Sequence, residues 1–177
     1  MTSPALGKHC DHAAVGVLIS SPNGQFLVFE RVRPPTGLAP VAGHLDQHGT
    51  PEQAARDEVR EEVGLTVTHL DLLLEQWQPN PCPRTPTGPV GHQWQVFQAQ
   101  VTGALRPSPR EVRAPRWLHP DQLQRCALRT AAYAQGHLSD TEFTQTPGLE
   151  PVWCRFLHTL QIISLPPDIL MQIGALL

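Results

Sequence analysis

Two short segments near the start of the chain are rich in the apolar and β-branched residues that favour β-strands. Residues 13–20 (AAVGVLIS) and 25–31 (QFLVFER) flank the sequence Ser-Pro-Asn-Gly at 21–24, and its Asn-Gly pair is a strong signal for a tight turn. Residues 33–37 (RPPTG) then interrupt the pattern with two prolines and a glycine. We therefore predict a β-hairpin followed by an irregular loop.

A helix is predicted from about residue 51 to residue 63, with recognisable signals at both ends. Thr50 and Gln53 have the spacing of a capping box, and Pro51 occupies the first helical position. Gly64 supplies the left-handed conformation that commonly ends a helix.

Three glutamates lie near the end of this helix. Glu58, Glu61 and Glu62 are spaced i, i+3 and i+4, so on an α-helix they project from one face. At about 4 Å, two like charges repel by roughly 1 kcal/mol in water and about 4 kcal/mol in a partly buried setting. A divalent cation with a preference for hard oxygen ligands, Mg²⁺ or Mn²⁺, would convert this cost into binding energy. The alternative is an exposed acidic face paired with Arg60.

The middle of the chain alternates strands with one long loop. Residues 65–77 form a run of β-forming residues, and the five prolines of 79–91 (PNPCPRTPTGPVG) predict an irregular loop. Residues 94–101 return as a strand whose alternating glutamines indicate one wet face. Residues 115–118 are predicted to form a further short strand.

From residue 119 onward the chain is predicted to be mainly helical. One helix should run from 119–121 to about 127, and a second stretch should continue to 135. Ser139 and Glu142 form a second capping box, and Pro151 begins a helix with apolar residues at helical spacing, Val152, Phe156, Leu160 and Ile163. Residues 164–177 are apolar but too rich in proline and glycine for a long helix. We interpret this region as a helical extension packed on the main domain; a lid or a homodimer contact is the alternative.

Composition and charge narrow the class of protein. A chain of 177 residues with 40% hydrophobic content fits one globular domain. The net charge of −3 argues against a nucleic acid as the main partner, because proteins that bind one present a basic face. No apolar stretch has the length of a membrane span or the form of a signal peptide, so we expect a cytoplasmic protein without a membrane partner.

The four cysteines are scattered and contain no CxxC pair, which is typical of reduced cytosolic thiols. Cys10, His9 and His12 are candidates to bind a zinc ion together with Cys82 or His92. The spacing does not support such a site, and we prefer a flexible N-terminal segment beside a strand.

The segment from Gly43 to Leu65 resembles the Nudix box of the Nudix hydrolase family, G-x5-E-x7-R-E-U-x-E-E-x-G-U with U a bulky aliphatic residue. The residues that match in register are Gly43, Glu58, Val59, Glu61, Glu62, Gly64 and Leu65. Two positions depart from the pattern: Gly49 replaces the first glutamate, and Asp57 replaces the arginine. The resemblance implies an α+β fold, the Nudix αβα sandwich with a mixed β-sheet, over residues 1–127, with residues 128–177 as the helical extension.

The resemblance also implies a Mg²⁺- or Mn²⁺-dependent hydrolase that cleaves a pyrophosphate bond in a nucleoside diphosphate linked to another group. Glu58, Glu61 and Glu62 would be the catalytic metal ligands, and Glu111, which precedes the short strand at 115–118, is our candidate for the general base. The residues expected to bind the substrate are Arg31, Arg33, Gly43 and Trp77. At strand spacing, Trp77 and Trp94 are also typical of a hydrophobic core.

The two departures from the box bear on activity. Asp46 or His48, in the same loop as Gly49, are candidates to replace the lost carboxylate. Because Asp57 reverses the charge at the arginine position, another cation has to orient the carboxylates, and the candidates are Arg31, Arg33 and Arg116. A nucleotide-binding or regulatory module with little turnover therefore stays open as an alternative, as does isomerisation of an isoprenyl diphosphate on the same fold.

Overall fold

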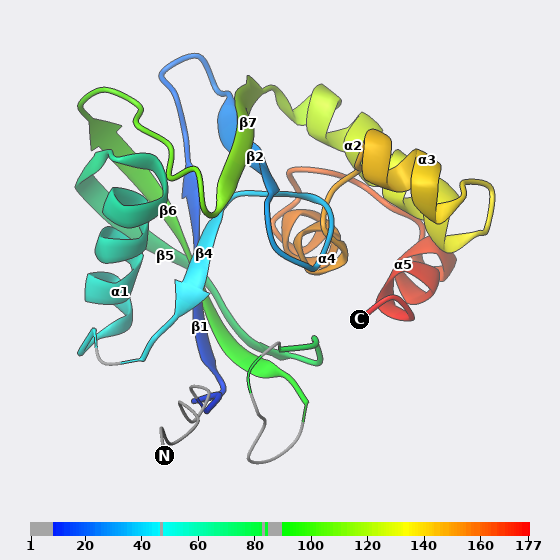
Figure 1. Ribbon diagram of the computed structural model, residues 1–177, viewed down its shortest axis with the longest axis horizontal. Coiled ribbons are helices and arrows are strands. Elements are labelled where there is room, and N and C mark those ends of the chain that lie inside the picture. The colour runs from blue at the N-terminus through cyan, green and yellow to red at the C-terminus, as the bar shows by residue number, and fades with distance from the viewer. Residues whose placement is uncertain (1–8, 47, 83, 85–89) are drawn as a thin grey trace, which may run out of the picture.

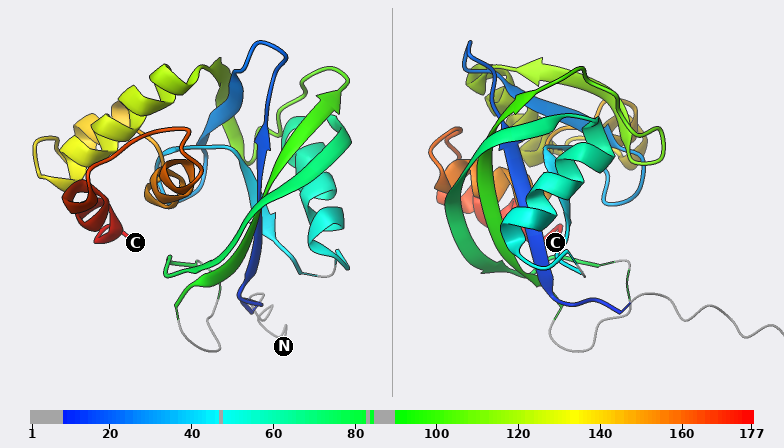
Figure 2. Two further views of the ribbon diagram at one scale, coloured as in Figure 1. Left: turned by 180° about the vertical axis from the view of Figure 1, so that it is seen from behind. Right: turned by 90° about the vertical axis from the view of Figure 1, so that its left-hand side faces the viewer.

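The computed structural model describes residues 9–46, 48–82, 84 and 90–177. Two β-sheets form the middle of the molecule, with helix α1 on one side and helices α2 to α5 on the other (Figure 1). Figure 2 shows the same layers from behind and from the side. This arrangement is the predicted α+β sandwich with C-terminal helices.

The larger sheet has four strands in the order β4-β1-β6-β5. β1 (Ala13–Ile19) pairs in parallel with β6 (His92–Thr102) and antiparallel with β4 (Val41–His44). β5 (Thr66–Gln78) pairs antiparallel with β6 and forms an edge. The sheet is therefore mixed, as predicted.

The smaller sheet has three antiparallel strands in the order β3-β2-β7. They are β3 (Leu38–Ala39), β2 (Phe26–Arg31) and β7 (Val112–Leu118), so the last strand begins three residues earlier than predicted. Of the predicted loop at 79–91, residues 83 and 85–89 lie outside the described residues, and the others have no regular structure.

The predicted β-hairpin between β1 and β2 is wrong. The turn at 21–24 forms, with the Gly24 amide donating to the Ser21 carbonyl at 3.0 Å, but beyond a bridge between Ser20 and Phe26 the strands enter different sheets. The physical reason is that β1 is apolar on both faces and occupies a central position. Both of its edges are already paired, with β4 and β6, which leaves no edge for β2.

The two faces of β1 belong to two hydrophobic cores. Val15, Val17 and Ile19 pack in the core that lies under α1, whereas Ala14 and Leu18 pack in the core formed with the C-terminal helices. This alternation follows the period of two along a strand.

The box helix is α-helical over α1 (Pro51–Glu58) and continues as a π-helical turn, η1 (Val59–Val63). The predicted ends are confirmed in part. The Gln53 amide donates to the Thr50 hydroxyl at 3.2 Å, and Gly64 adopts a left-handed φ of 72°. The prediction of a regular α-helix to residue 63 is wrong in the last turn, where the π-helical winding changes the direction of the side chains.

The C-terminal helices are α2 (Pro120–Ala134), α3 (Asp140–Gln145), α4 (Pro151–Thr159) and α5 (Pro167–Gly174). The predicted break in α2 near residue 127 is wrong, because Leu123, Ala127 and Ala131 form one continuous buried stripe at i, i+4 and i+8. The capping box at Ser139 is confirmed by both of its hydrogen bonds.

Helix α4 connects the C-terminal region to the larger sheet. Its fully buried Trp153 and Phe156 meet the ring of Trp94 from β6 at centroid distances of 6.2 and 5.2 Å. Ile163 follows the end of α4 but is also buried in this core. Among the described residues, no helix has both the length and the apolar character that crossing a membrane requires.

Candidate active site

The box helix lies against strand β4, and Gly43 is the point of closest approach. A Cβ atom at this position would lie 1.8 Å from Glu58 Oε1, far inside van der Waals contact. Only glycine therefore allows the Glu58 carboxylate to cross β4 at this point.

Glu62 reaches the same strand one residue earlier. Its Oε2 accepts a hydrogen bond from the Ala42 amide at 3.2 Å, and the side chain is buried. Glu58 and Glu62 thus meet the backbone of β4 at adjacent residues, and we call them the carboxylate pair.

Burial and mutual repulsion make ionisation of the carboxylate pair costly. Loss of solvation, followed by the charge of Glu61, raises the pKa of Glu58 to about 7. Burial raises the pKa of Glu62 well above its ordinary value, and the charge of Glu58 raises it further. At neutral pH the pair is therefore only partly ionised, and a positive charge placed beside it would favour the fully ionised form.

Glu61 occupies a different position from the pair. Its side chain is 57% exposed, and Oε1 lies 3.9 Å from Arg60 Nη2. It still raises the pKa of Glu58, so it lies within electrostatic reach. The π-helical turn thus leaves two carboxylates inside and one at the solvent boundary.

Asp57, at the arginine position of the box, is held by contacts with neighbouring side chains. It is buried, and its carboxylate contacts Arg60 Nη2 at 2.7 Å and His48 Nδ1 at 3.1 Å. A hydrogen bond from Gln53 and those from His48 and Arg60 lower its pKa. Asp57 therefore holds the preceding loop against the helix as an ionised group.

His48 is the positive group that lowers the pKa of Glu58, whereas Arg31 is the one of the three candidate arginines that acts on Glu62. Its charge lowers the pKa of Glu62, and its Nη1 lies 3.5 Å from Oε2 of the buried Glu150. Arg116 instead donates to Glu30 at 3.0 Å, and Arg33 is exposed. The sequence offered three arginines as the cation beside the carboxylates, and the structure favours Arg31.

Glu111 approaches from the other sheet. It lies directly before β7, is half-buried, and its charge raises the pKa of both Glu58 and Glu62. Its backbone carbonyl accepts from the Val32 amide at 3.2 Å, which fixes it beside the end of β2. A fourth carboxylate is thus near the pair, although its role as base stays a prediction.

A cavity of about 80 Å³ adjoins the carboxylate pair through Arg31, Ala42 and Gly43. Its other lining residues are Ala14, Pro34, Pro35, His44, Asn80, Pro81, Cys82, His92, Trp94 and Glu150. Small-molecule sites usually enclose roughly 300 Å³ or more, so a substrate of nucleotide size has to extend outside this cavity.

The two tryptophans have different surroundings. Trp94 is a core residue that also faces the cavity, whereas Trp77 does not line the cavity and is 43% exposed. The Trp77 ring is stacked with His12 at a centroid distance of 6.4 Å. Sequence reasoning missed Glu150, Asn80 and His44 as cavity residues, and no pattern around them distinguishes them from ordinary polar positions.

The chain is similar to known proteins in both sequence and fold. The NUDIX domain profile matches residues 11–140, which extends past the boundary expected at residue 127. No protein in a search of curated proteins matches the chain.

Several solved structures have the same fold at low sequence identity. The MutT protein from Methanosarcina mazei Go1 is 14% identical with a TM-score of 0.60, covering 88% of this chain and 94% of that one. The dihydroneopterin triphosphate pyrophosphohydrolase of E. coli is 20% identical with a TM-score of 0.54, over 64% and 84% of the two chains. A NUDIX-family hydrolase from Clostridium perfringens is 20% identical with a TM-score of 0.52, over 64% and 85%.

The sandwich fold, the carboxylate pair held against a glycine, and the family profile together define the class of protein. The chain belongs to the NUDIX family of phosphoanhydride hydrolases.

Proposed function

We propose that this protein uses Mg²⁺ or Mn²⁺ to hydrolyse a pyrophosphate bond in a nucleoside diphosphate linked to another group. The observation that carries the proposal is the carboxylate pair, which is buried, mutually repulsive and placed on the backbone of β4. Within the protein, Arg31 opposes the charge of Glu62 and His48 opposes that of Glu58, and Arg31 is shared with Glu150. The pair is therefore short of positive charge.

The donor atoms fit a hard divalent cation. Glu58 and Glu62 would hold it from inside, with the exposed Glu61 available from the solvent side. When bound, such an ion offsets the charge that develops on the bridging oxygen and orients the diphosphate. These ligand assignments are part of the proposal.

The chain's own residues would position the substrate and move the proton. Arg31, at the border between the cavity and the pair, is placed to contact a phosphate, and the absence of a side chain at Gly43 lets the substrate approach β4. Glu111 would accept a proton from the attacking water. The exposed Arg33 and Trp77 would contact outer parts of the substrate.

The rival function, a nucleotide-binding module with little turnover, is favoured by the two departures from the box. Asp57 is engaged with Arg60 and His48, and at Gly49 a Cβ atom would meet no described residue within 4 Å. One carboxylate is thus lost without a replacement at the same position. We favour the hydrolase because the carboxylate pair itself is complete.

A release screen distinguishes the two functions. Purified protein is incubated with Mg²⁺ or Mn²⁺ and with nucleoside triphosphates, ADP-ribose, nucleotide sugars or dinucleotides, and the products are separated by chromatography. The hydrolase should release two phosphorylated products, and Glu62→Gln should abolish the release. Glu52→Gln is the matched control, because Glu52 is an exposed glutamate in the first turn of the same helix. Nucleotide binding without release by the wild-type protein would establish the binding module instead.

We further propose that residues 128–177 complete the same domain, since α4 packs against β6 in a shared core. A nucleotide-type small molecule as the partner, a cytoplasmic location and a homodimer through the apolar tail also stay proposals. Sedimentation of the purified chain tests the last, and a monomer at all concentrations would exclude it.

A further inference from the structure

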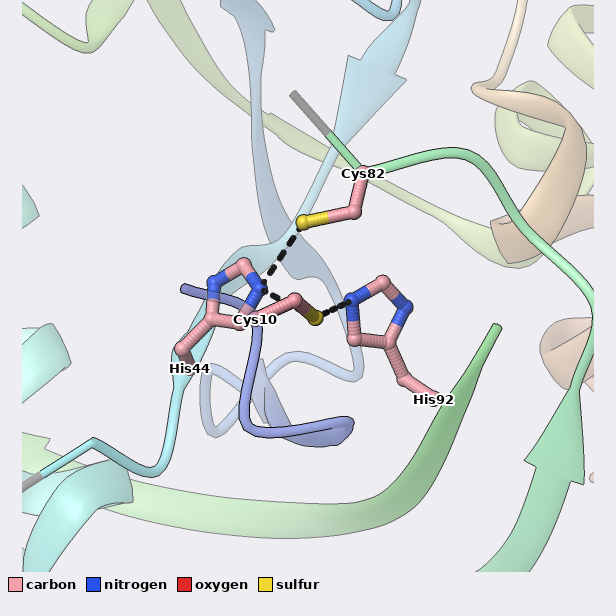
Figure 3. Close-up of side chains that lie close together, drawn as sticks. All are labelled: Cys10, His44, Cys82 and His92. Carbon is pink, nitrogen blue, oxygen red and sulfur yellow. Dashed lines mark hydrogen bonds between the residues drawn. The ribbon is translucent and has the colours of Figure 1, made fainter. Parts of the chain in front are cut away.

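A second group of metal-binding side chains lies at the end of the larger sheet, apart from the carboxylate pair. It consists of Cys10, His44, Cys82 and His92, which we call the Cys/His cluster (Figure 3). One donor atom from each of the four residues lies within 4.8 Å of the others. We propose that the Cys/His cluster is a structural zinc site.

The spacing of the donor atoms fits a tetrahedral ion. Cys10 Sγ lies 3.3 Å from His92 Nε2 and 3.8 Å from His44 Nε2. Cys82 Sγ lies 3.3 Å from His44 Nε2. With Zn–S bonds of about 2.3 Å and Zn–N bonds of about 2.0–2.1 Å, the edges of a zinc tetrahedron measure about 3.3–3.8 Å.

The histidine from β6 is held with its free nitrogen toward the cluster. His92 Nδ1 lies 2.9 Å from Asn80 Oδ1, which also accepts from Trp94 Nε1 at 3.1 Å. Because an indole nitrogen only donates, this Asn80 atom is the acceptor oxygen and His92 Nδ1 carries the proton. The lone pair of Nε2 therefore faces Cys10, which is the arrangement by which outer residues orient a metal-binding histidine.

Both sulfur atoms accept a backbone hydrogen bond from the residue two positions later. The His12 amide donates to Cys10 Sγ, and the Arg84 amide donates to Cys82 Sγ, each at 3.4 Å. Such backbone contacts orient a metal-binding sulfur. His12 adopts a left-handed φ of 56°, which a residue with a side chain rarely does, and this turn places its amide on the sulfur.

The chemistry of the four ligands selects the metal. Thiolate and imidazole are soft or borderline ligands that suit zinc, whereas Mg²⁺ prefers the oxygen atoms of the carboxylate pair. Two thiolates and two neutral imidazoles cancel the charge of one Zn²⁺, so the complete site is neutral in its partly buried position.

The four ligands come from four separate parts of the larger sheet. Cys10 precedes β1, His44 ends β4, Cys82 follows β5 and His92 begins β6. One ion would thus join all four strands at the same end. An Arg84–Asp46 ion pair fastens the same segments beside the cluster.

The cluster also adjoins the catalytic side of the molecule. His44 follows Gly43 directly, and His44, Cys82 and His92 line the cavity. Because four protein ligands leave no open coordination position, the ion would stabilise this wall and take no part in the reaction. In contrast to the flexible N-terminal segment expected from the sequence, Cys10 is buried and contacts His92, whereas His9 and His12 do not belong to the cluster.

The first test measures metal content and cobalt spectra of the whole chain. Wild-type protein should bind one zinc ion per chain, and the cobalt-substituted protein should show the near-ultraviolet band of thiolate-to-cobalt charge transfer. Cys10→Ser and Cys82→Ser should lose the band. Cys126→Ser, a half-buried cysteine outside the cluster, is the matched control and should keep it.

Two further measurements make the test decisive. Glu62→Gln should keep the zinc and the charge-transfer band even if it abolishes hydrolysis, so failure of the proposed activity is separated from failure of the zinc site. If the cysteine variants do not fold, alkylation of wild-type protein replaces them: Cys10 and Cys82 should be protected by zinc and become reactive when a chelator is added, while Cys126 does not change.

Three results would overturn the proposal. They are a wild-type chain that takes up neither zinc nor cobalt through sulfur, equal alkylation of Cys10 and Cys82 with and without zinc, and a disulfide between these two residues in protein purified without oxidant.

Discussion

The carboxylate pair and the Cys/His cluster meet at adjacent residues of β4, yet they are built in opposite ways. Glu58 and Glu62 come from one turn of helix and meet one strand. The ligands of the cluster come from positions 10 to 92 and meet only because the larger sheet brings the ends of its strands together. A site contained in one segment is visible as a motif, whereas a site assembled from distant segments is not. The same difference predicts separate metals, because one site offers hard oxygen and the other sulfur and nitrogen.

The largest effect is expected from Glu62→Gln. It removes a buried charge from the carboxylate pair and should lower kcat/KM by about 100-fold or more, since the loss of one charged ligand removes several kcal/mol of transition-state stabilisation. Steady-state kinetics with Mg²⁺ measures this loss against the Glu52→Gln control. If the two sites are independent, zinc content stays at the wild-type level. A variant with full activity would exclude Glu62 from the site.

Gly43→Ala should disturb both sites at once. The added Cβ atom would collide with Glu58, and the shift would pass to His44 in the next position. Because the colliding atoms are the movable end of the Glu58 side chain, we expect at least a tenfold loss of activity with little change in stability. The matched control is Gly174→Ala, where the Cβ would meet only the end of the Arg155 side chain at 2.9 Å. Steady-state kinetics and zinc analysis measure the two effects, and equal activity of both variants would contradict the close approach.

The pH dependence of the metal-free protein tests the burial of Glu58. Its pKa in the folded state is raised to about 7 from an ordinary value of 4.5. The stability that protonated Glu58 contributes to the folded state is therefore fully present below about pH 4.5. It is lost as the pH rises through about 7. We expect a loss of roughly 2–3 kcal/mol between these limits.

Thermal unfolding at pH 5 and pH 8 with chelator present measures this loss. Glu58→Gln should flatten the dependence, and Mg²⁺ should restore stability at the higher pH. Activity should likewise rise with pH through neutrality, because the pair must be ionised to bind metal. Identical pH curves for the variant and the wild type would show that Glu58 is not desolvated.

The smallest effect is expected from Gly49→Glu, which restores the first glutamate of the box. The new side chain would start from a backbone with a φ of 91°, and its Cβ atom would have no described residue within 4 Å. We expect a destabilisation of about 1 kcal/mol from the left-handed conformation and a change in rate of less than about threefold. Gly49→Ala carries the same strain without the charge and is the control. A large gain in rate over Gly49→Ala would show that the missing carboxylate limits catalysis.

Local signals in the sequence gave correct predictions where neighbouring residues alone decide the structure. The start of α1 at Pro51, its end at Gly64 and the capping box at Ser139 depend on contacts within a few residues. The box itself is a local motif, so membership of the family followed from it. The placement of Glu58 and Glu62 on one side of the helix, where both meet β4, followed for the same reason.

Predictions failed where distant parts of the chain compete. Asn-Gly made the turn after β1, but the pairing of β1 was decided by β4 and β6. In the same way, three arginines were equal candidates to act on the carboxylates. Only packing placed Arg31 beside Glu62 and paired Arg116 with Glu30.

By itself, the sequence determined the class of fold, the box helix with its ends, and a carboxylate-rich site contained in that helix, because these depend on spacing along one segment. The tertiary structure decided which arginine faces the pair, that Glu61 lies outside it, and that Cys10, His44, Cys82 and His92 converge. The physical reason is that strand order in a sheet is set by the burial of both its faces. Residues at the ends of neighbouring strands therefore meet at distances that their separation along the chain does not reveal.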